Sequence, residues 1–192
     1  FLPFNKGVDD GAGNPVNPNG LKTAYLWEEI LRKERLSDIL EHYAQVIVEK
    51  DEETGKKKEK IIWPRWHQLE VVRSLLNETA SHGVGQKFLI QHSAGSGKSN
   101  SITWLAYQLV ELLQGTKSMF DSVICVTDRV ILDKQLRDNI KAFSHNENIV
   151  DWANSSDKLR QHLENGKKII LTTVHKFSFI IEAVGAELAN KR

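Results

Sequence analysis

Apolar residues recur at every third or fourth position in several stretches of the chain, which is the spacing of a helix that buries one face. The clearest case follows Gly97, where Ile102, Leu105, Ala106 and Leu109 fall on one side of a helix. The helices expected on this ground cover residues 23–31, 37–43, 64–80, 97–114, 132–143 and 157–163.

Short apolar runs lie between these helices, and we expect them to be strands. Three of them, Phe88–Ile90, Val123–Thr127 and Ile169–Val174, alternate with helices along the chain. This alternation favours a parallel, doubly wound sheet that binds its ligands at the carboxyl ends of the strands. The predicted fold class is therefore α/β.

The first 60 residues follow a different pattern. Residues 1–20 hold three of the four prolines and predict an arm of turns. The runs Val46–Val48 and Ile61–Trp63 flank Gly55 and predict a β-hairpin, whose charges we interpret as a solvated turn. We therefore expect an N-terminal region of arm, helices and hairpin over residues 1–60, and an α/β lobe over residues 61–192.

A loop of small residues joins the run Phe88–Ile90 to the helix after Gly97. Strand, glycine-rich loop, Gly-Lys-Ser and helix are the layout of a phosphate-binding P-loop, although the strict pattern has glycine where this chain has His92. The backbone N–H groups of such a loop and of the helix N-terminus point at one anion. We expect Lys98 to contact the terminal phosphates, and the Ser99 hydroxyl to bind Mg²⁺. The predicted phosphate-binding residues are Ser93, Ala94, Gly95, Ser96, Gly97, Lys98 and Ser99.

Composition narrows the function classes. The chain has 192 residues, is 40% hydrophobic and has a net charge of +1, so any nucleic-acid binding must come from a local basic face. It has no apolar run long enough to span a membrane and no signal peptide, so we expect a cytoplasmic protein. Cys125, the single cysteine, lies in an apolar run and is expected to be a buried structural thiol. The chain does not begin with Met, which suggests a piece of a longer protein.

Arg65 and Gln68 lie about thirty residues before Lys98. A glutamine can donate to and accept from the edge of an adenine, so we expect these two residues to recognise the base of a nucleotide. The alternative is that both are ordinary surface residues of a helix.

Polar residues also stand at the ends of the second and third predicted strands, where ligands of such sheets bind. Hydroxyl groups and cations there suit contacts with nucleic-acid phosphates, although Asp128 is equally suited to cap the following helix. The DNA-binding candidates are Thr127, Asp128, Arg129, Thr172, Thr173 and Lys176.

Six segments occur in one order along the chain. They are FLPFNKG at residues 1–7, YLWEE at 25–29, PRWHQ at 64–68, SAGSGKS at 93–99, VTDRVILDKQL at 126–136 and ILTT at 170–173. Together they resemble the restriction subunit of type I restriction–modification enzymes, which has a superfamily 2 helicase-like motor. The resemblance extends over nearly the whole chain.

The resemblance implies an ATP-driven translocase of double-stranded DNA that works with methylation and specificity subunits and cuts DNA with a separate nuclease domain. It implies a RecA-like P-loop sheet, here an incomplete first motor lobe, with ATP and Mg²⁺ as cofactors. Under it, Arg65 and Gln68 correspond to the adenine-recognising Q motif and residues 93–99 to motif I. Residues 126–136 correspond to motif Ia, and residues 170–176 to the next DNA-contacting motif.

An ATPase motor also needs an acidic pair at a strand end to hold Mg²⁺ and position water. No such pair follows the P-loop in this chain, and the nuclease signature of the family is absent from it. We therefore expect the parent protein to be an ATP-dependent type I site-specific deoxyribonuclease, and this piece to bind ATP weakly and without turnover.

Two other interpretations stay open. In a P-loop kinase of small molecules, Asp128 would be the catalytic acid or a metal ligand. In a non-catalytic docking module, residues 1–60 would bind a partner subunit and the P-loop would be a relic.

Overall fold

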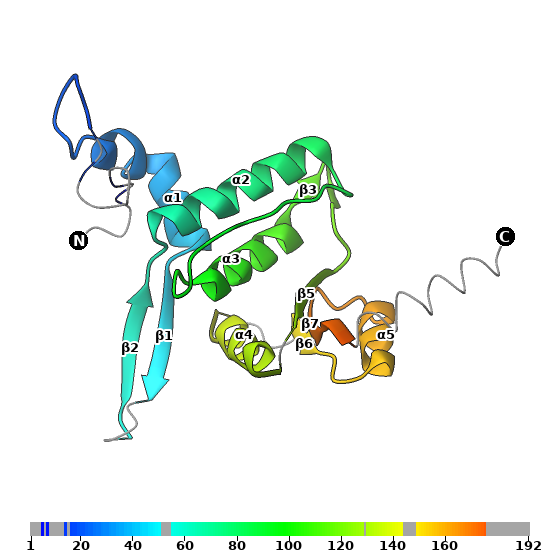
Figure 1. Cartoon of the computed structure of the whole chain (residues 1–192). Coiled ribbons are helices and arrows are strands. Elements are labelled where there is room, and N and C mark those ends of the chain that lie inside the picture. The colour runs from blue at the N-terminus through cyan, green and yellow to red at the C-terminus, as the bar shows by residue number, and fades with distance from the viewer. Residues whose placement is uncertain are drawn as a thin grey trace. The chain divides into compact units, whose positions relative to one another are not determined.

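The computed structural model describes residues 5, 7, 14, 16–50, 55–128, 130–143 and 149–175, and the chain divides into two compact units. We call Phe1–Leu75 with Phe88–Trp104 the loop unit, because it contains the P-loop, and Leu76–Lys87 with Leu105–Arg192 the sheet unit. Helices α2 (Trp66–His82) and α3 (Lys98–Glu111) each contribute residues to both units (Figure 1).

A three-stranded parallel sheet forms the centre of the sheet unit. Its strands are β5 (Val123–Thr127), β6 (Val150–Trp152) and β7 (Ile169–Thr173), in the order β5-β7-β6. The central strand β7 pairs Ile169 with Val123 on one side and with Val150 on the other. All five residues of β7 are buried, as expected of a central parallel strand covered on both faces.

Helices cover both faces of this sheet. Ile169 and Leu171 of β7 pack in a cluster with residues of α3 and of α4 (Val130–Phe143), whereas Ile170 packs with Leu159 of α5 (Ser156–Glu164). Successive residues of a strand point to opposite faces of the sheet, so the apolar run in β7 contributes side chains to the clusters on both faces. Burying each of these side chains contributes about 1.5–3 kcal/mol. The α/β fold class predicted from the sequence is confirmed.

The loop unit contains a short π-helical turn η1 (Leu26–Ile30), helix α1 (Lys33–His42) and an antiparallel hairpin of β1 (Gln45–Lys50) and β2 (Lys57–Ile62). The predicted hairpin is therefore confirmed, and in Figure 1 it extends away from α1. The sequence predicted its turn around Thr54 and Gly55; Thr54 lies outside the described residues.

The core of the loop unit is built around Trp104 of α3. Its indole N–H donates to the carbonyl of Tyr43 at 2.9 Å, and the two rings lie 5.8 Å apart. Both residues are at most 1% exposed, and Ile39, Leu69 and Val72 are buried in the same unit. The contact between Trp104 and Tyr43 joins α3 to the residue that follows α1.

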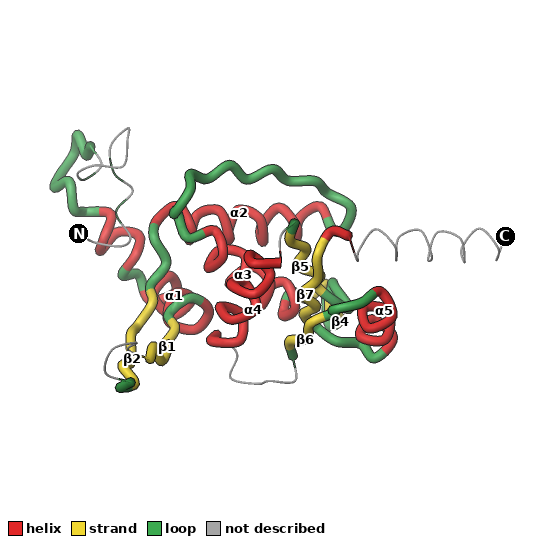
Figure 2. Tube along the Cα trace, turned by 60° about the horizontal axis from the view of Figure 1, so that its bottom comes forward, coloured by secondary structure: helices red, strands yellow, loops and turns green. Residues whose placement is uncertain are grey.

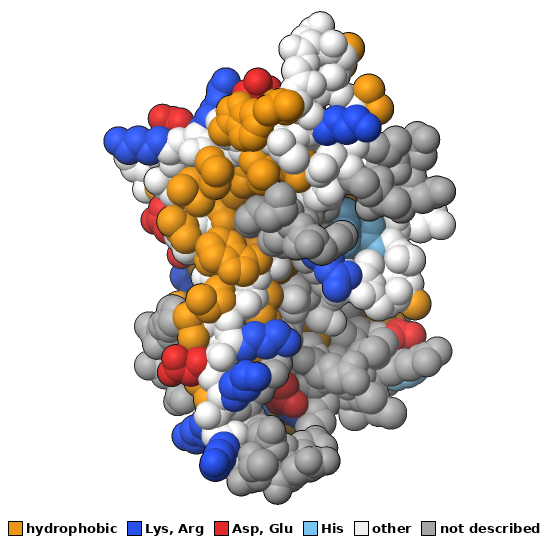
Figure 3. All heavy atoms as spheres, turned by 90° about the vertical axis from the view of Figure 1, so that its left-hand side faces the viewer, with side chains coloured by type: hydrophobic (Ala, Val, Ile, Leu, Met, Phe, Trp, Pro, Cys, Tyr) orange, Lys and Arg blue, Asp and Glu red, His pale blue; other side chains and the backbone are white. Residues whose placement is uncertain are grey.

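The helix predicted over residues 23–31 is wrong in length and in its buried face. Only the single turn η1 forms, no side chain caps it, and Trp27 and Leu31 are 50% and 55% exposed. The next helix begins at Lys33 rather than Ser37, and Leu40 is exposed. Figure 3 views the left-hand side of Figure 1, and apolar side chains form a band on that side.

The strand predicted at Phe88–Ile90 is also wrong. These residues form an extended loop segment, drawn as loop in Figure 2, and Leu89 is 95% exposed. A strand needs a neighbour for its N–H and C=O groups, and no strand in the described part of the chain pairs with this run.

The structure adds strands that the sequence did not predict. Strand β6 is one, and a small hairpin of β3 (Leu113–Gln114) and β4 (Lys117–Ser118) is another. Helix α3 accordingly ends at Glu111 instead of residue 114. The helical tail expected after Val174 lies mostly outside the described residues. Among the described helices, none is both long and apolar enough to cross a bilayer.

Candidate phosphate-binding site

The loop between His92 and α3 turns sharply before the helix begins at Lys98. The Ser96 N–H donates to the Ser93 carbonyl at 3.4 Å, and the Gly97 carbonyl accepts the N–H of Asn100 at 3.0 Å. Gly97 has a φ of 80°, a backbone conformation that residues other than glycine rarely adopt. A Cβ at this position would also clash with the Gln68 amide nitrogen, so a larger residue here would displace the Gln68 side chain.

Several backbone N–H groups of the loop are available to an anion. Within the described part of the chain, the N–H groups of Gly95, Gly97, Lys98 and Ser99 donate to no acceptor. The last two belong to the first turn of α3, where the helix dipole also favours negative charge. Such a group of unpaired donors fits a phosphate.

The ammonium group of Lys98 lies over the loop. It donates to the carbonyl of Ser93 at 2.7 Å and to that of His92 at 3.2 Å, and the side chain is exposed. These bonds hold the cation at the residues with which the loop begins. Ser99 is also exposed, so its hydroxyl is accessible to a metal ion carried by a phosphate.

Gln68 binds the loop itself. Its amide nitrogen donates to the carbonyls of Gly97 at 2.9 Å and Ser96 at 3.3 Å, and its oxygen accepts the N–H of Arg65 at 2.8 Å. The residue is 3% exposed. Its donors are therefore already used by protein carbonyls, whereas Arg65 is exposed. Recognition of adenine by these two residues stays a prediction.

Two histidines complete the support of the loop. The His67 ring nitrogen Nε2 lies 2.9 Å from the Ser96 carbonyl, which can only accept, so His67 donates. The rings of His67 and His92 meet edge to face, with centroids 5.0 Å apart. Burial lowers the pKa of His92, and the nearby His67 and Lys98 lower it further. This pair was not predicted from the sequence, where its only signal is His92 in place of the glycine of the strict pattern.

A pocket of about 300 Å³ adjoins the loop. Gly95 and Gly97 of the loop, Asn100, Arg65 and Gln68 line it, together with the end of β2. It therefore combines unpaired backbone donors with an exposed guanidinium group, and none of its described lining residues is acidic. These properties suit a polyanion.

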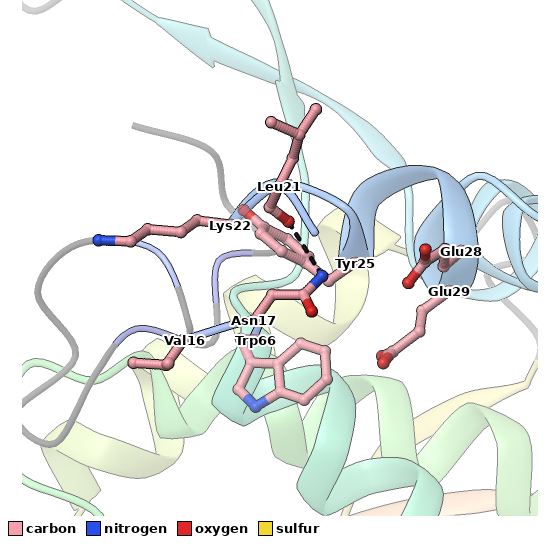
Figure 4. A pocket seen from close by; sticks show the side chains of 8 residues that line it. All are labelled: Val16, Asn17, Leu21, Lys22, Tyr25, Glu28, Glu29 and Trp66. Carbon is pink, nitrogen blue, oxygen red and sulfur yellow. Dashed lines mark hydrogen bonds between the residues drawn. The ribbon is translucent and has the colours of Figure 1, made fainter. Parts of the chain in front are cut away.

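A second pocket of about 250 Å³ in the loop unit has the opposite character (Figure 4). Tyr25 and Trp66 line it together with the carboxylates of Glu28 and Glu29. Figure 4 shows the Lys22 ammonium extending away from these carboxylates. Two acidic side chains repel a phosphate, so the pocket at the glycine loop is the better nucleotide site.

The candidate DNA-binding residues lie in the sheet unit. The register of β5 and β7 brings Thr127 beside Thr173 at the carboxyl edge of the sheet, as predicted. However, Thr172 and Thr173 are 0% and 4% exposed, and the Thr172 hydroxyl donates to the Ala153 carbonyl at 3.4 Å. Their contact with DNA stays a prediction that this burial does not favour.

The charged members of that set are less informative. Asp128 is exposed at the end of β5, whereas Arg129 and Lys176 lie outside the described residues.

Cys125 is buried as predicted, and burial raises the pKa of its thiol to about 11. Among the described residues, no group of three His, Cys, Asp or Glu side chains could hold a metal ion.

Comparison with protein families now adds to this geometry. The SWI2/SNF2 ATPase family matches residues 67–192, which is more than half of the chain and includes the glycine loop and the parallel sheet. The chain belongs to the SWI2/SNF2 ATPase family. No curated protein matches the chain in a sequence comparison.

Membership of this family identifies the chain as part of an ATPase. The chain carries part of a superfamily 2 helicase-like ATPase, and its three-stranded sheet with flanking helices is a partial RecA-like fold. Nucleotide binding and ATP hydrolysis are the activity of such a domain. That the glycine loop before α3 binds the phosphates stays a prediction. Residues 1–66 lie outside the match.

Proposed function

We propose that this chain is the ATP-binding part of a DNA translocase, the restriction subunit of a type I restriction–modification enzyme. In this proposal ATP binds at the glycine loop, Ser99 holds Mg²⁺, and the energy of hydrolysis in the intact subunit moves double-stranded DNA. Methylation and specificity subunits are its partners, and a nuclease domain elsewhere in the subunit cuts the DNA.

One observation carries the nucleotide part of this proposal. The segment Pro64–Gln68 and the loop Ser93–Ser99, both named in the resemblance, are joined by bonds from His67 and Gln68 to the carbonyls of Ser96 and Gly97. Two segments almost thirty residues apart therefore build one pocket, with Arg65 on its wall. The order of all six segments along the chain supports the type I assignment over other members of the family.

The chemistry of the chain's own residues follows from this arrangement. The unpaired N–H groups of Gly97, Lys98 and Ser99 bind phosphate oxygens, and Lys98 exchanges its loop carbonyls for the terminal phosphates. Bound Mg²⁺ neutralises phosphate charge in this class of reaction. The chain thereby binds and orients the triphosphate, and hydrolysis needs acidic residues supplied elsewhere in the subunit.

Calorimetric titration with ATP and Mg²⁺ tests the nucleotide site. Replacing Lys98 with Ala removes a charge-assisted bond to phosphate, so we expect affinity to fall about 100-fold. Lys87→Ala removes an exposed lysine outside the loop and is the matched control, with unchanged affinity expected. Equal affinities for wild type and Lys98→Ala would contradict the site.

The type I assignment needs a separate test with the intact subunit. We expect it to co-purify with methylation and specificity subunits and to hydrolyse ATP only when double-stranded DNA carries their recognition site. DNA-stimulated hydrolysis without these subunits would instead indicate another kind of SWI2/SNF2 ATPase. Replacing Lys98 with Ala abolishes hydrolysis in either case and confirms that the signal comes from this loop.

A further inference from the structure

His67 contacts the glycine loop at a point that controls where the loop directs its donors. The Ser96 carbonyl accepts from His67 Nε2 at 2.9 Å and from Gln68 at 3.3 Å, so both of its lone pairs are used. The peptide plane between Ser96 and Gly97 is rigid, with C=O and N–H on opposite sides. Holding the carbonyl towards α2 therefore directs the Gly97 N–H away from α2.

We propose that His67 is a positioning residue for the phosphate loop, and that His92, packed against its ring, keeps it in the orientation that presents the Gly97 N–H to a nucleoside triphosphate. This inference rests on the proposed nucleotide site and adds two residues to it. Gln68 acts in the same way on the next peptide plane, since it holds the Gly97 carbonyl at 2.9 Å.

In the chain without nucleotide, the surroundings of His92 favour its neutral ring. Its imidazole faces His67 of α2 and Lys98 at the start of α3, and these two groups with burial lower its pKa. The edge-to-face contact fills the space beside the loop, where the strict pattern has glycine and therefore no side chain. A bound polyanion offsets the neighbouring positive charge, so nucleotide binding raises the pKa of His92.

Calorimetry with ATP and Mg²⁺ on the whole chain tests the role of His67. We expect His67→Ala to weaken binding about 10-fold, because one loop-orienting hydrogen bond is lost. His67→Gln keeps a donor at this place and is expected to restore affinity to within about threefold of wild type. His82→Ala, at the exposed end of α2, is the control. Wild-type affinity in His67→Ala, or no rescue by glutamine, overturns the proposal.

The pH dependence of binding tests His92. We expect wild type to gain affinity between pH 8 and pH 6 relative to His92→Asn, which cannot take up the proton. ATP itself titrates in this range, and dividing the affinity of wild type by that of His92→Asn at each pH removes the contribution of ATP. At pH 8, where both side chains are neutral, equal affinities of wild type and His92→Asn overturn the packing role of His92. A ratio that does not change with pH overturns its proton uptake.

A measurement without nucleotide separates this inference from the proposed function. Nitrogen-15 spectra of the imidazoles are expected to show His67 protonated at Nε2 and His92 neutral at pH 7. If wild type binds no ATP but these spectra are found, the nucleotide site fails and the histidine pair stands. If His67 carries its proton on Nδ1 instead, the pair fails whatever the nucleotide result.

Discussion

The central strand β7 and the glycine loop are stabilised in opposite ways. Strand β7 is buried along its whole length, and Ile169, Ile170 and Leu171 are fully enclosed by apolar neighbours. The glycine loop is mostly exposed, and hydrogen bonds from His67, Gln68 and Lys98 hold its carbonyls. The strand therefore depends on buried area, whereas the loop depends on a few directed bonds.

This difference separates stability from binding. Removing apolar volume from β7 is expected to lower the free energy of unfolding strongly. Removing a bond from the loop changes the directions of a few N–H groups, which nucleotide affinity detects more sensitively than stability does. The predictions that follow test this separation.

The largest expected effect is on stability, in the sheet unit. Leu171 is fully buried, so Leu171→Ala is expected to lower the free energy of unfolding by about 2–5 kcal/mol. Leu89 is 95% exposed in the segment before the loop, and Leu89→Ala is expected to change it by less than about 0.5 kcal/mol. Urea titration followed by circular dichroism measures both. Similar losses in the two variants would show that Leu89 is packed in solution.

A smaller difference in stability loss is expected between two glycines of similar backbone conformation. Gly83 and Gly97 have φ values of 75° and 80°, but only Gly97 lies against another side chain, that of Gln68. Replacing Gly83 with Ala is expected to cost about 1–2 kcal/mol for the backbone conformation alone. Gly97→Ala is expected to cost about 1–3 kcal/mol more, because Gln68 must leave its carbonyl partners. Thermal denaturation compares the two, and equal losses would contradict the Gln68 contact.

The smallest effect is the dependence of stability on pH. Folding lowers the pKa of His92, so the unfolded chain takes up a proton at a higher pH than the folded chain does. The contribution of His92 to the free energy of unfolding is therefore fully present above its ordinary pKa of about 6.5. It is lost as the pH falls below that value. His92→Asn should lack this part of the pH dependence. Urea titrations at pH 5.5 and pH 7.5 measure it, and parallel losses in both proteins would assign the effect to other groups.

Periodicity and motif chemistry predicted the elements that depend on buried area or on a well-defined loop. The strands predicted at Val123–Thr127 and Ile169–Val174 each begin with a run of apolar residues, and both are confirmed, although the second ends at Thr173. The hairpin before the loop and the helix after it were predicted equally well. Strand β6 was missed because it is short and contains Asp151, whose carboxylate pairs with Lys167 at 2.7 Å.

The contacts that shape the loop could not be predicted from a single sequence. His67 and Gln68 lie 29 and 28 residues from Ser96, and no periodicity relates a side chain to a carbonyl so far along the chain. The run Phe88–Ile90 shows the converse failure. Its composition is that of a strand, but pairing depends on a partner that composition does not reveal.

The burial of Cys125 makes this chain convenient for thiol labelling. A cysteine that is 8% exposed and has a pKa of about 11 reacts slowly with maleimides in the native state, since the thiolate is the reactive form. Because it is the single cysteine, a dye attached to a cysteine introduced at an exposed position is the only label on the folded protein. Slow modification of Cys125 itself then reports how often the sheet opens.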